Sequence, residues 1–81
     1  MTDDQALHNI ATNLKRLRVE KGLSMAALAR EINDYPATIK RIEDEACMPG
    51  AGLLTRIAEA LGSTANDLLA EPPSRKLSHA S

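Results

Sequence analysis

Aromatic residues are almost absent from this 81-residue chain: Tyr35 is the only one, and there is no Phe or Trp. A hydrophobic core must therefore be built from Leu, Ile and Ala. These residues do not alternate strictly with polar ones and form almost no β-branched runs, so the pattern argues against strands and predicts an all-α fold. The length suits one small domain.

Several kinds of site are also missing. A single cysteine, Cys47, excludes an internal disulfide and reads as loop packing. There is neither a secretory signal nor a long apolar run, so we expect a cytoplasmic protein without membrane contact. His8 and His79 are isolated, which argues against a metal site. No base lies where a serine or threonine nucleophile needs one, so we expect no catalysis. The sequence also gives no sign of a cofactor or of a small-molecule ligand, and we expect neither.

Charge is unevenly distributed, although the net charge is only −1. Residues 1–41 carry seven basic and five acidic side chains, whereas residues 42–71 carry one basic and six acidic ones. A basic front suits an anionic partner such as phosphate. An ordinary solvated helix surface explains the same distribution equally well.

The stretch from residue 23 to residue 42, LSMAALAREINDYPATIKRI, is the most specific pattern in the chain. Two short amphipathic segments flank a turn at Asn33, a residue type that tolerates the left-handed backbone conformation. The small Ala29 suits a close helix crossing, and Ile39 and Ile42 are spaced to face back onto the first segment. This is the pattern of a helix-turn-helix, over residues 24–44, that offers its second helix to the major groove of DNA.

Capping residues set the expected helices. Thr2 and Gln5 form a capping box that starts the first helix, and Gly22 ends it. Ser24 precedes a second helix running to about residue 32. Pro36, tolerated only in a first turn, begins a third helix that ends near residues 43–45.

Two more helices and a tail complete the expected organisation. After a loop over residues 44–49, the pattern predicts a fourth helix over residues 51–61. Thr64 caps a short fifth helix, with Asp67 at the reciprocal capping position. We expect a single domain over residues 1–70 and a flexible tail over residues 71–81, after Pro72-Pro73 interrupts regular structure.

Three segments in this order resemble a known family: NLKRLRVEKGLSMAALA, IKRIEDEACMP and LLTRIAEALGSTANDLL. They are similar to the lambda-repressor/Cro-type helix-turn-helix domains, the XRE family, over roughly residues 9–70. The resemblance implies a compact five-helix lambda-repressor-like domain. It also implies a sequence-specific transcriptional regulator, most simply a repressor, that binds operator DNA as a two-fold symmetric dimer.

The resemblance assigns roles to residues. It implies base contacts by Pro36, Ala37, Lys40 and Arg41. It implies phosphate contacts by Arg18, Met25, Tyr35 and Thr38.

For some of these positions the alternatives stay open. Arg41 is expected to be the main base reader, with a phosphate contact or a solvated charge as the alternatives. Tyr35 is equally compatible with a half-buried turn anchor. Arg18 is expected to pair with Glu43 and also to stand beside a phosphate, and a purely structural pair is the alternative.

This chain departs from the family pattern at several positions. Met25 replaces a residue that is often Gln, which leaves only backbone N–H groups for phosphate at that helix start. Asp34 stands where an apolar residue is usual and is expected to cap the third helix. The usual Gly and basic residue are replaced here by Asp44, Glu45 and Ala46. The carboxylates of Asp44 and Glu45 must point away from DNA or weaken its binding.

Other functions remain alternatives. Dimerisation through the last two helices would use a small apolar patch around Leu53 and Leu69. The acidic surface equally suits a protein-interaction module, such as an antitoxin or partner-docking domain. The chain is also compatible with the N-terminal DNA-binding part of a longer regulator.

Overall fold

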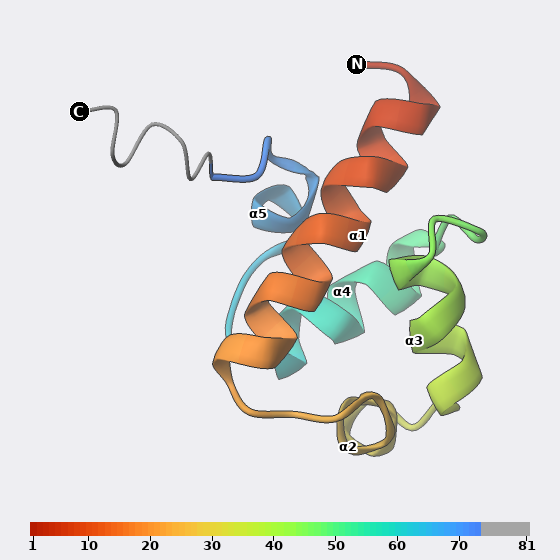
Figure 1. Cartoon of the computed structure of the whole chain (residues 1–81), viewed down its shortest axis with the longest axis vertical. Coiled ribbons are helices and arrows are strands. Elements are labelled where there is room, and N and C mark those ends of the chain that lie inside the picture. The colour runs from red at the N-terminus through yellow and green to blue at the C-terminus, as the bar shows by residue number, and fades with distance from the viewer. Residues whose placement is uncertain (74–81) are drawn as a thin grey trace.

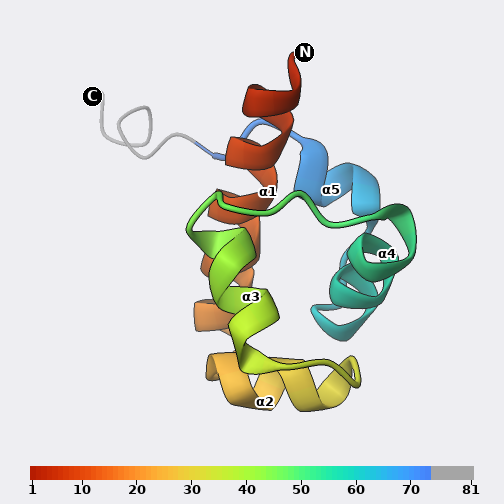
Figure 2. The same ribbon diagram turned by 90° about the vertical axis from the view of Figure 1, so that its right-hand side faces the viewer.

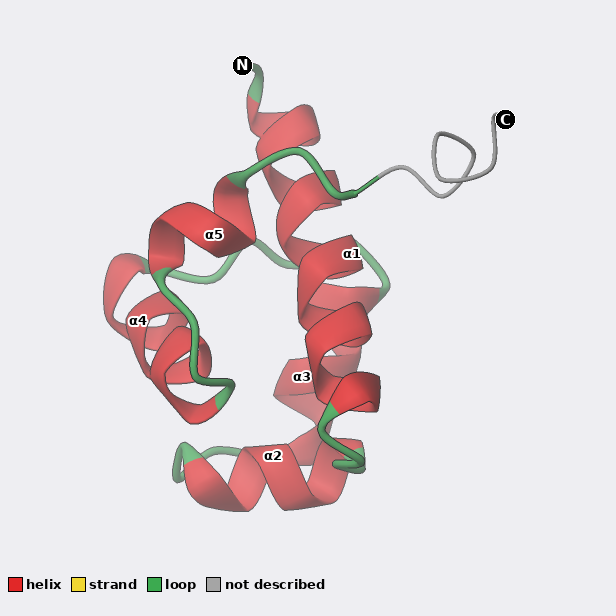
Figure 3. Ribbon diagram, turned by 90° about the vertical axis from the view of Figure 1, so that its left-hand side faces the viewer, coloured by secondary structure: helices red, strands yellow, loops and turns green. Residues whose placement is uncertain are grey.

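The computed structural model describes residues 1–73, which contain five helices and no strand (Figures 1 and 3). The helices are α1 (Asp3–Glu20), α2 (Met25–Glu31), α3 (Pro36–Glu43), α4 (Ala51–Ala60) and α5 (Ala65–Leu69). The expected all-α, five-helix fold is therefore confirmed. Residues 74–81, which contain most of the predicted flexible tail and His79, lie outside the described residues.

The long helix α1 packs against two of the other helices, α3 and α5 (Figure 1). It contacts α3 along one side and α5 along another, while α2 contacts both α3 and α4. Figure 2 shows α2 crossing one end of the molecule with α3 rising from it. No helix within residues 1–73 combines the length and apolar character that crossing a bilayer requires.

Helix α1 begins as its capping residues predict. The Thr2 hydroxyl accepts from the Gln5 N–H at 3.1 Å, and the Gln5 side chain accepts from the Thr2 N–H at 2.9 Å. Asp3 and Asp4 lie in the first turn, next to the positive end of the helix dipole. Local sequence alone is therefore sufficient to start this helix.

Two residues after the last residue of each of helices α1 to α4, the backbone has a positive φ, at Gly22, Asn33, Glu45 and Gly62. In each, the next N–H bonds back to a carbonyl of the last turn, as Asp34 does to Ala29 at 2.8 Å. The predicted left-handed Asn33 is confirmed, with φ 60°. Glu45 is the residue among these four that the left-handed region disfavours. It has a Cβ, unlike Gly, and its longer side chain lacks the local hydrogen bonding of Asn.

The core is entirely aliphatic. It lies where α1, α2, α3, α4 and α5 meet, and each fully buried Leu or Ile there stabilises the fold by roughly 1.5–3 kcal/mol. Its buried members are Ile10, Leu14, Leu28, Ala29, Ile32, Ile39, Ile42, Leu54, Ile57, Ala58, Leu61 and Leu68. Leu53 and Leu69, the residues of the expected dimer patch, are half-buried against this core.

One buried polar residue was missed by the sequence reasoning. Asn13 is 1% exposed, and its Nδ2 lies 3.2, 2.8 and 2.8 Å from the carbonyl oxygens of Asp67, Leu68 and Ala70. Its Oδ1 accepts from Arg16 at 3.1 Å. Asn13 therefore satisfies carbonyls at the end of α5 that have no partner within that short helix. The available signal was an Asn between Ile10 and Leu14 on the apolar stripe of α1.

The predicted capping box of α5 is only half correct. The Thr64 hydroxyl accepts from the Asp67 N–H at 3.1 Å, as expected. The Asp67 carboxylate, however, accepts from the Ser63 hydroxyl at 3.0 Å instead of returning to Thr64. Ser63, the residue before the cap, thus supplies the donor that the Asp67 carboxylate uses.

Candidate nucleic-acid interface

Helices α2 and α3 meet at a tight crossing. Ala29, whose side chain is a single methyl group, is 1% exposed on the buried face of α2. Ile39 and Ile42, one turn apart on α3, are completely buried and face inward. The helix-turn-helix geometry expected from residues 23–42 is therefore present, and α3 is held by its apolar side.

The opposite side of α3 faces solvent. Pro36, Ala37, Lys40 and Arg41, the four residues predicted to contact bases, are all exposed. Their spacing places them on one side of the helix because side chains three and four residues apart are neighbours. The structure thus brings the predicted base contacts together on an open face.

The two cations of this face differ in their partners. The Lys40 Nζ lies 2.9 Å from Asp44 Oδ2, one turn further along the helix, and both side chains are more than half exposed. The hydrogen bond to Asp44, and the charge of Asp44, raise the pKa of Lys40 above its ordinary value. Arg41 takes part in none of the ion pairs formed within residues 1–73.

Asp34 does not cap α3 as expected. The N-cap residue is Tyr35, and Asp34 precedes it. The Asp34 Oδ1 accepts from the Thr38 hydroxyl and from the Tyr35 N–H, both at 2.7 Å, and its Oδ2 lies 3.9 Å from Arg56 Nη2. These hydrogen bonds, first that from Thr38, lower the pKa of Asp34, and the charges of Arg56 and Arg41 lower it further. Asp34 lies one residue before the N-cap and therefore connects the turn to α3, through Thr38, and to α4, through Arg56.

The predicted phosphate contacts lie in different surroundings. Tyr35 is 75% exposed, so the alternative of a half-buried turn anchor is wrong. Thr38 is half-buried, and its hydroxyl already donates to Asp34. Met25 packs half-buried against the core, but it opens α2, where backbone N–H groups have no partner within the helix.

The predicted pair of Arg18 and Glu43 is confirmed. Arg18 Nε and Nη2 donate to the two carboxylate oxygens of Glu43 at 2.7 and 3.1 Å, and Nη1 donates to the Leu23 carbonyl at 2.8 Å. The side chains are 11% and 3% exposed. The hydrogen bonds to Glu43 raise the pKa of Arg18 despite the opposing effect of burial. Arg18 therefore connects α1 to α3 through Glu43 and to the loop before α2 through the Leu23 carbonyl.

The two carboxylates that follow α3, those of Asp44 and Glu45, point in different directions. Asp44 turns toward Lys40, on the outward face, whereas the Glu45 carboxylate lies 3.0 Å from His8 Nδ1 on α1. Ala46 is exposed beside them. The sequence predicted only that these carboxylates must point away from DNA or weaken its binding. In the structure Glu45 points away from the exposed face of α3, toward His8, whereas Asp44 stays beside Lys40 on that face.

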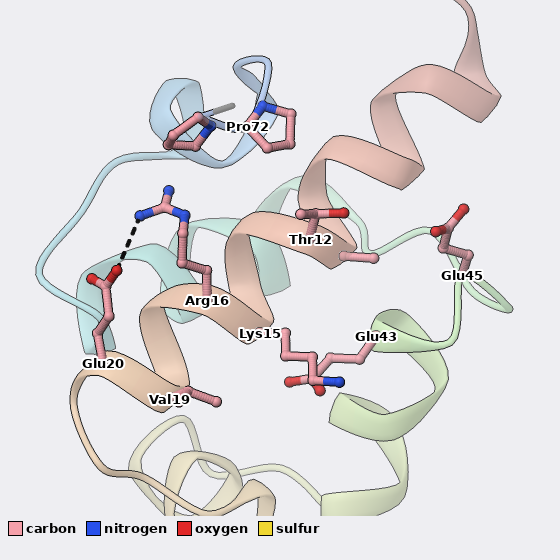
Figure 4. Close-up of a pocket in the computed structure, with 10 residues that line it drawn as sticks. Thr12, Lys15, Arg16, Val19, Glu20, Glu43, Glu45 and Pro72 are labelled. Atoms are coloured by element: carbon pink, nitrogen blue, oxygen red, sulfur yellow. Dashed lines mark ion pairs between the residues drawn. The ribbon is translucent and has the colours of Figure 1, made fainter. Parts of the chain in front are cut away.

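A groove of about 560 Å³ runs along α1 between the end of α3 and Pro72-Pro73 (Figure 4). None of the eight residues predicted to contact DNA lines it. Its acidic groups have partners: Glu43 pairs with Arg18, Glu45 with His8, and Glu20 with Arg16 at 3.6 Å. The carboxylates that line the groove are therefore already paired.

Other reactive groups are scattered. Within residues 1–73, no three His, Cys, Asp or Glu side chains gather as metal ligands would. Cys47 is a half-buried free thiol whose Sγ lies 3.9 Å from the Met48 carbonyl oxygen. The exposed face of α3 is consequently the best-organised candidate site on this part of the chain.

Comparisons with known proteins agree with this geometry. The family model HTH_3, described as helix-turn-helix, matches residues 14–68. The solved structure of a hypothetical transcription factor, NHTF, from Neisseria is similar with 29% identity and a TM-score of 0.80, covering 96% of this chain and 90% of that one. No curated protein matches the chain.

Two further solved structures are longer than this chain. An HTH_3 family transcriptional regulator from Vibrio cholerae is 31% identical, with a TM-score of 0.77, over 83% of this chain and 38% of that one. Hydroxypropylphosphonic acid epoxidase from S. wedmorenis is 28% identical, with a TM-score of 0.76, over 83% of this chain and 36% of that one. The chain therefore spans little more than a third of either protein.

Proposed function

This chain belongs to the helix-turn-helix family HTH_3 and is a DNA-binding transcriptional regulator. We propose that it represses transcription by placing α3 in the major groove of an operator. The observation that carries the proposal is the two-sided character of α3. Ile39 and Ile42 are completely buried, while Pro36, Ala37, Lys40 and Arg41 are exposed together on the other side.

Arg41 is the main base reader in this proposal. A guanidinium that is exposed and outside the ion pairs of residues 1–73 is available to donate two hydrogen bonds to guanine O6 and N7. Lys40 supplies a second donor once it leaves Asp44, and Ala37 offers a methyl contact to thymine. Pro36 completes the contact surface at the start of the helix.

Phosphate contacts surround this face and position it. The N–H groups at the start of α2, beginning with Met25, are oriented for an anion. Tyr35 offers an exposed ring and hydroxyl, and Thr38 contributes its hydroxyl only if it releases Asp34. Arg18 has little exposed surface, so its contribution to phosphate binding is smaller than its contribution to holding α3 in place.

Repression follows from occupancy of the operator. Two copies related by a two-fold axis, meeting through α4 and α5, read half-sites about one DNA turn apart and block polymerase. The protein acts in the cytoplasm and has no catalytic activity. The epoxidase resembles this chain over only 36% of its own length, and the likeness is one of fold.

The test is DNA binding by the protein and by Arg41→Ala, measured by fluorescence anisotropy with random and selected duplexes over a range of salt concentrations. Binding to phosphates predicts a linear fall of log affinity with log salt. Arg41→Ala should lose about 1–3 kcal/mol on the selected duplex and lose preference at one base position. Arg30→Ala, which removes an exposed arginine from α2, is the matched control and should keep that preference.

Two results would contradict the proposal. An unchanged base preference in Arg41→Ala would remove Arg41 from the role of base reader. Absence of any salt-dependent binding to duplex DNA would favour the protein-interaction module instead. A longer regulator with this domain as its DNA-binding part is the second candidate, because this chain spans only 38% of the Vibrio cholerae regulator.

A further inference from the structure

The ion pair between Lys40 and Asp44 has a consequence for how the proposed interface selects DNA. Both side chains are exposed, at 65% and 55%, and they lie on the outward side of α3. We propose that Asp44 is a specificity-determining residue: it occupies Lys40 in the free protein and releases it only to guanine, which suppresses binding to other sequences. This inference rests on the proposed placement of α3 in the major groove.

Asp44 is poorly placed for the stability of α3. It is the C-cap residue, at the negative end of the helix dipole, where a carboxylate is unfavourable. The next residue, Glu45, has φ 61° and adds a second negative charge at the same helix end. Such violations of local preference are expected where a residue serves function instead of folding.

The two neighbouring carboxylates have different surroundings, and only one of them acts on the proposed interface. Glu45 is drawn toward His8 on α1, at 3.0 Å. Asp44 stays beside the base-contacting face, 2.9 Å from the Lys40 ammonium. An identical change of charge at these adjacent positions should therefore have different effects on DNA binding.

The selection works through competition for the Lys40 ammonium. Over a sequence without guanine at the right position, Asp44 is the better partner for Lys40. Over guanine, O6 and N7 together provide two acceptors that replace the single exposed ion pair, which is worth little by itself. Asp44 thus lowers affinity for random DNA more than affinity for the operator.

The experiment compares Asp44→Asn with Glu45→Gln, its matched control one residue away, on a random duplex and on a duplex obtained by binding-site selection with the wild-type protein. Asp44→Asn should bind the random duplex about 1.5- to fivefold more tightly, with a log–log salt slope steeper by about 0.9. It should gain less on the selected duplex, so the ratio of the two affinities falls. Glu45→Gln should change the random-duplex affinity by a smaller factor.

A second pair of variants separates release of Lys40 from simple loss of charge repulsion. If Asp44 acts by occupying Lys40, the gain from Asp44→Asn disappears when Lys40→Gln is already present. A gain that persists in full in that background would overturn the proposal, as would equal gains from Asp44→Asn and Glu45→Gln. Circular dichroism melts of each variant check that the fold is retained.

Failure of this inference differs from failure of the proposed function. Salt-dependent DNA binding by the wild type, together with no gain from Asp44→Asn, overturns only the role of Asp44. Absence of salt-dependent binding by the wild type and by Asp44→Asn overturns both.

Discussion

The buried pair of Arg18 and Glu43 provides the most quantitative prediction. Glu43→Gln keeps the shape of the side chain but removes the charge opposite a guanidinium that is only 11% exposed. Removing one partner of a buried ion pair typically destabilises a protein by 3–5 kcal/mol. Gln still accepts one hydrogen bond, so we expect a loss of about 3 kcal/mol in the free energy of unfolding.

That loss is large for a domain of this size. A chain of 81 residues is expected to unfold with a free energy of roughly 4–12 kcal/mol. At about 4–8 °C for each kcal/mol, Glu43→Gln should lower the melting temperature by roughly 12–24 °C. Urea and thermal unfolding followed by far-UV circular dichroism measure both quantities, with Glu31→Gln on the exposed side of α2 as the matched control.

A combined variant distinguishes structural support from phosphate contact at Arg18. Arg18→Met together with Glu43→Leu removes both charges, and buried ion pairs replaced by apolar side chains often lose no stability. The combined variant should therefore recover most of the stability lost in Glu43→Gln. An unchanged salt slope for DNA binding would assign Arg18 a structural role, and a slope shallower by about 0.9 would indicate one lost phosphate contact.

A melting temperature of Glu43→Gln within a few degrees of the wild type would contradict this prediction. The pair would then behave like an exposed ion pair, which is worth at most about 1 kcal/mol. The low exposure of both side chains, at 11% and 3%, would in that case have no energetic consequence.

Two more predictions concern contacts outside the proposed interface. Asn13→Leu should destabilise the protein by about 2–3 kcal/mol, because carbonyls at the end of α5 lose their donor. Hydrogen exchange should accelerate in α5 before it does in α2, and uniform acceleration of both helices would contradict this prediction. The lowered pKa of Asp34 means that its carboxylate stabilises the folded state above the ordinary Asp pKa of about 3.9, a contribution lost as the pH falls through the lower folded value. Acid unfolding should therefore steepen below about pH 4 in the wild type but not in Asp34→Asn, and parallel stability curves would contradict the prediction.

The expectations that proved correct mostly depend on neighbours along the chain. The Thr2 capping box, the left-handed Asn33 and the inward Ile39 and Ile42 follow from spacings of a few residues. The Arg18–Glu43 pair joins residues distant in sequence, and the resemblance to the XRE family identified it. Composition predicted the helical class because an aliphatic chain without alternation has few other ways to form a core.

Other features depend on which side chains meet after packing. Asp34 follows a helix end and precedes Pro36, so a capping role was reasonable, yet it reaches Thr38 and Arg56 from one position earlier. The role of Asn13 requires that α5 end against α1. The exposure of Tyr35, at 75%, likewise depends on how the turn packs, and residue type alone left both alternatives open.

By itself, the sequence determined the helices, the aliphatic core and the presence of a helix-turn-helix, because caps and hydrophobic periodicity act over one or two turns. Only the tertiary structure decided the direction of the acidic loop, with Asp44 beside Lys40 and Glu45 beside His8. The physical reason is that a carboxylate takes the nearest available donor. For Glu45 that donor lies 37 residues away in sequence and becomes a neighbour only when α1 packs beside the end of α3.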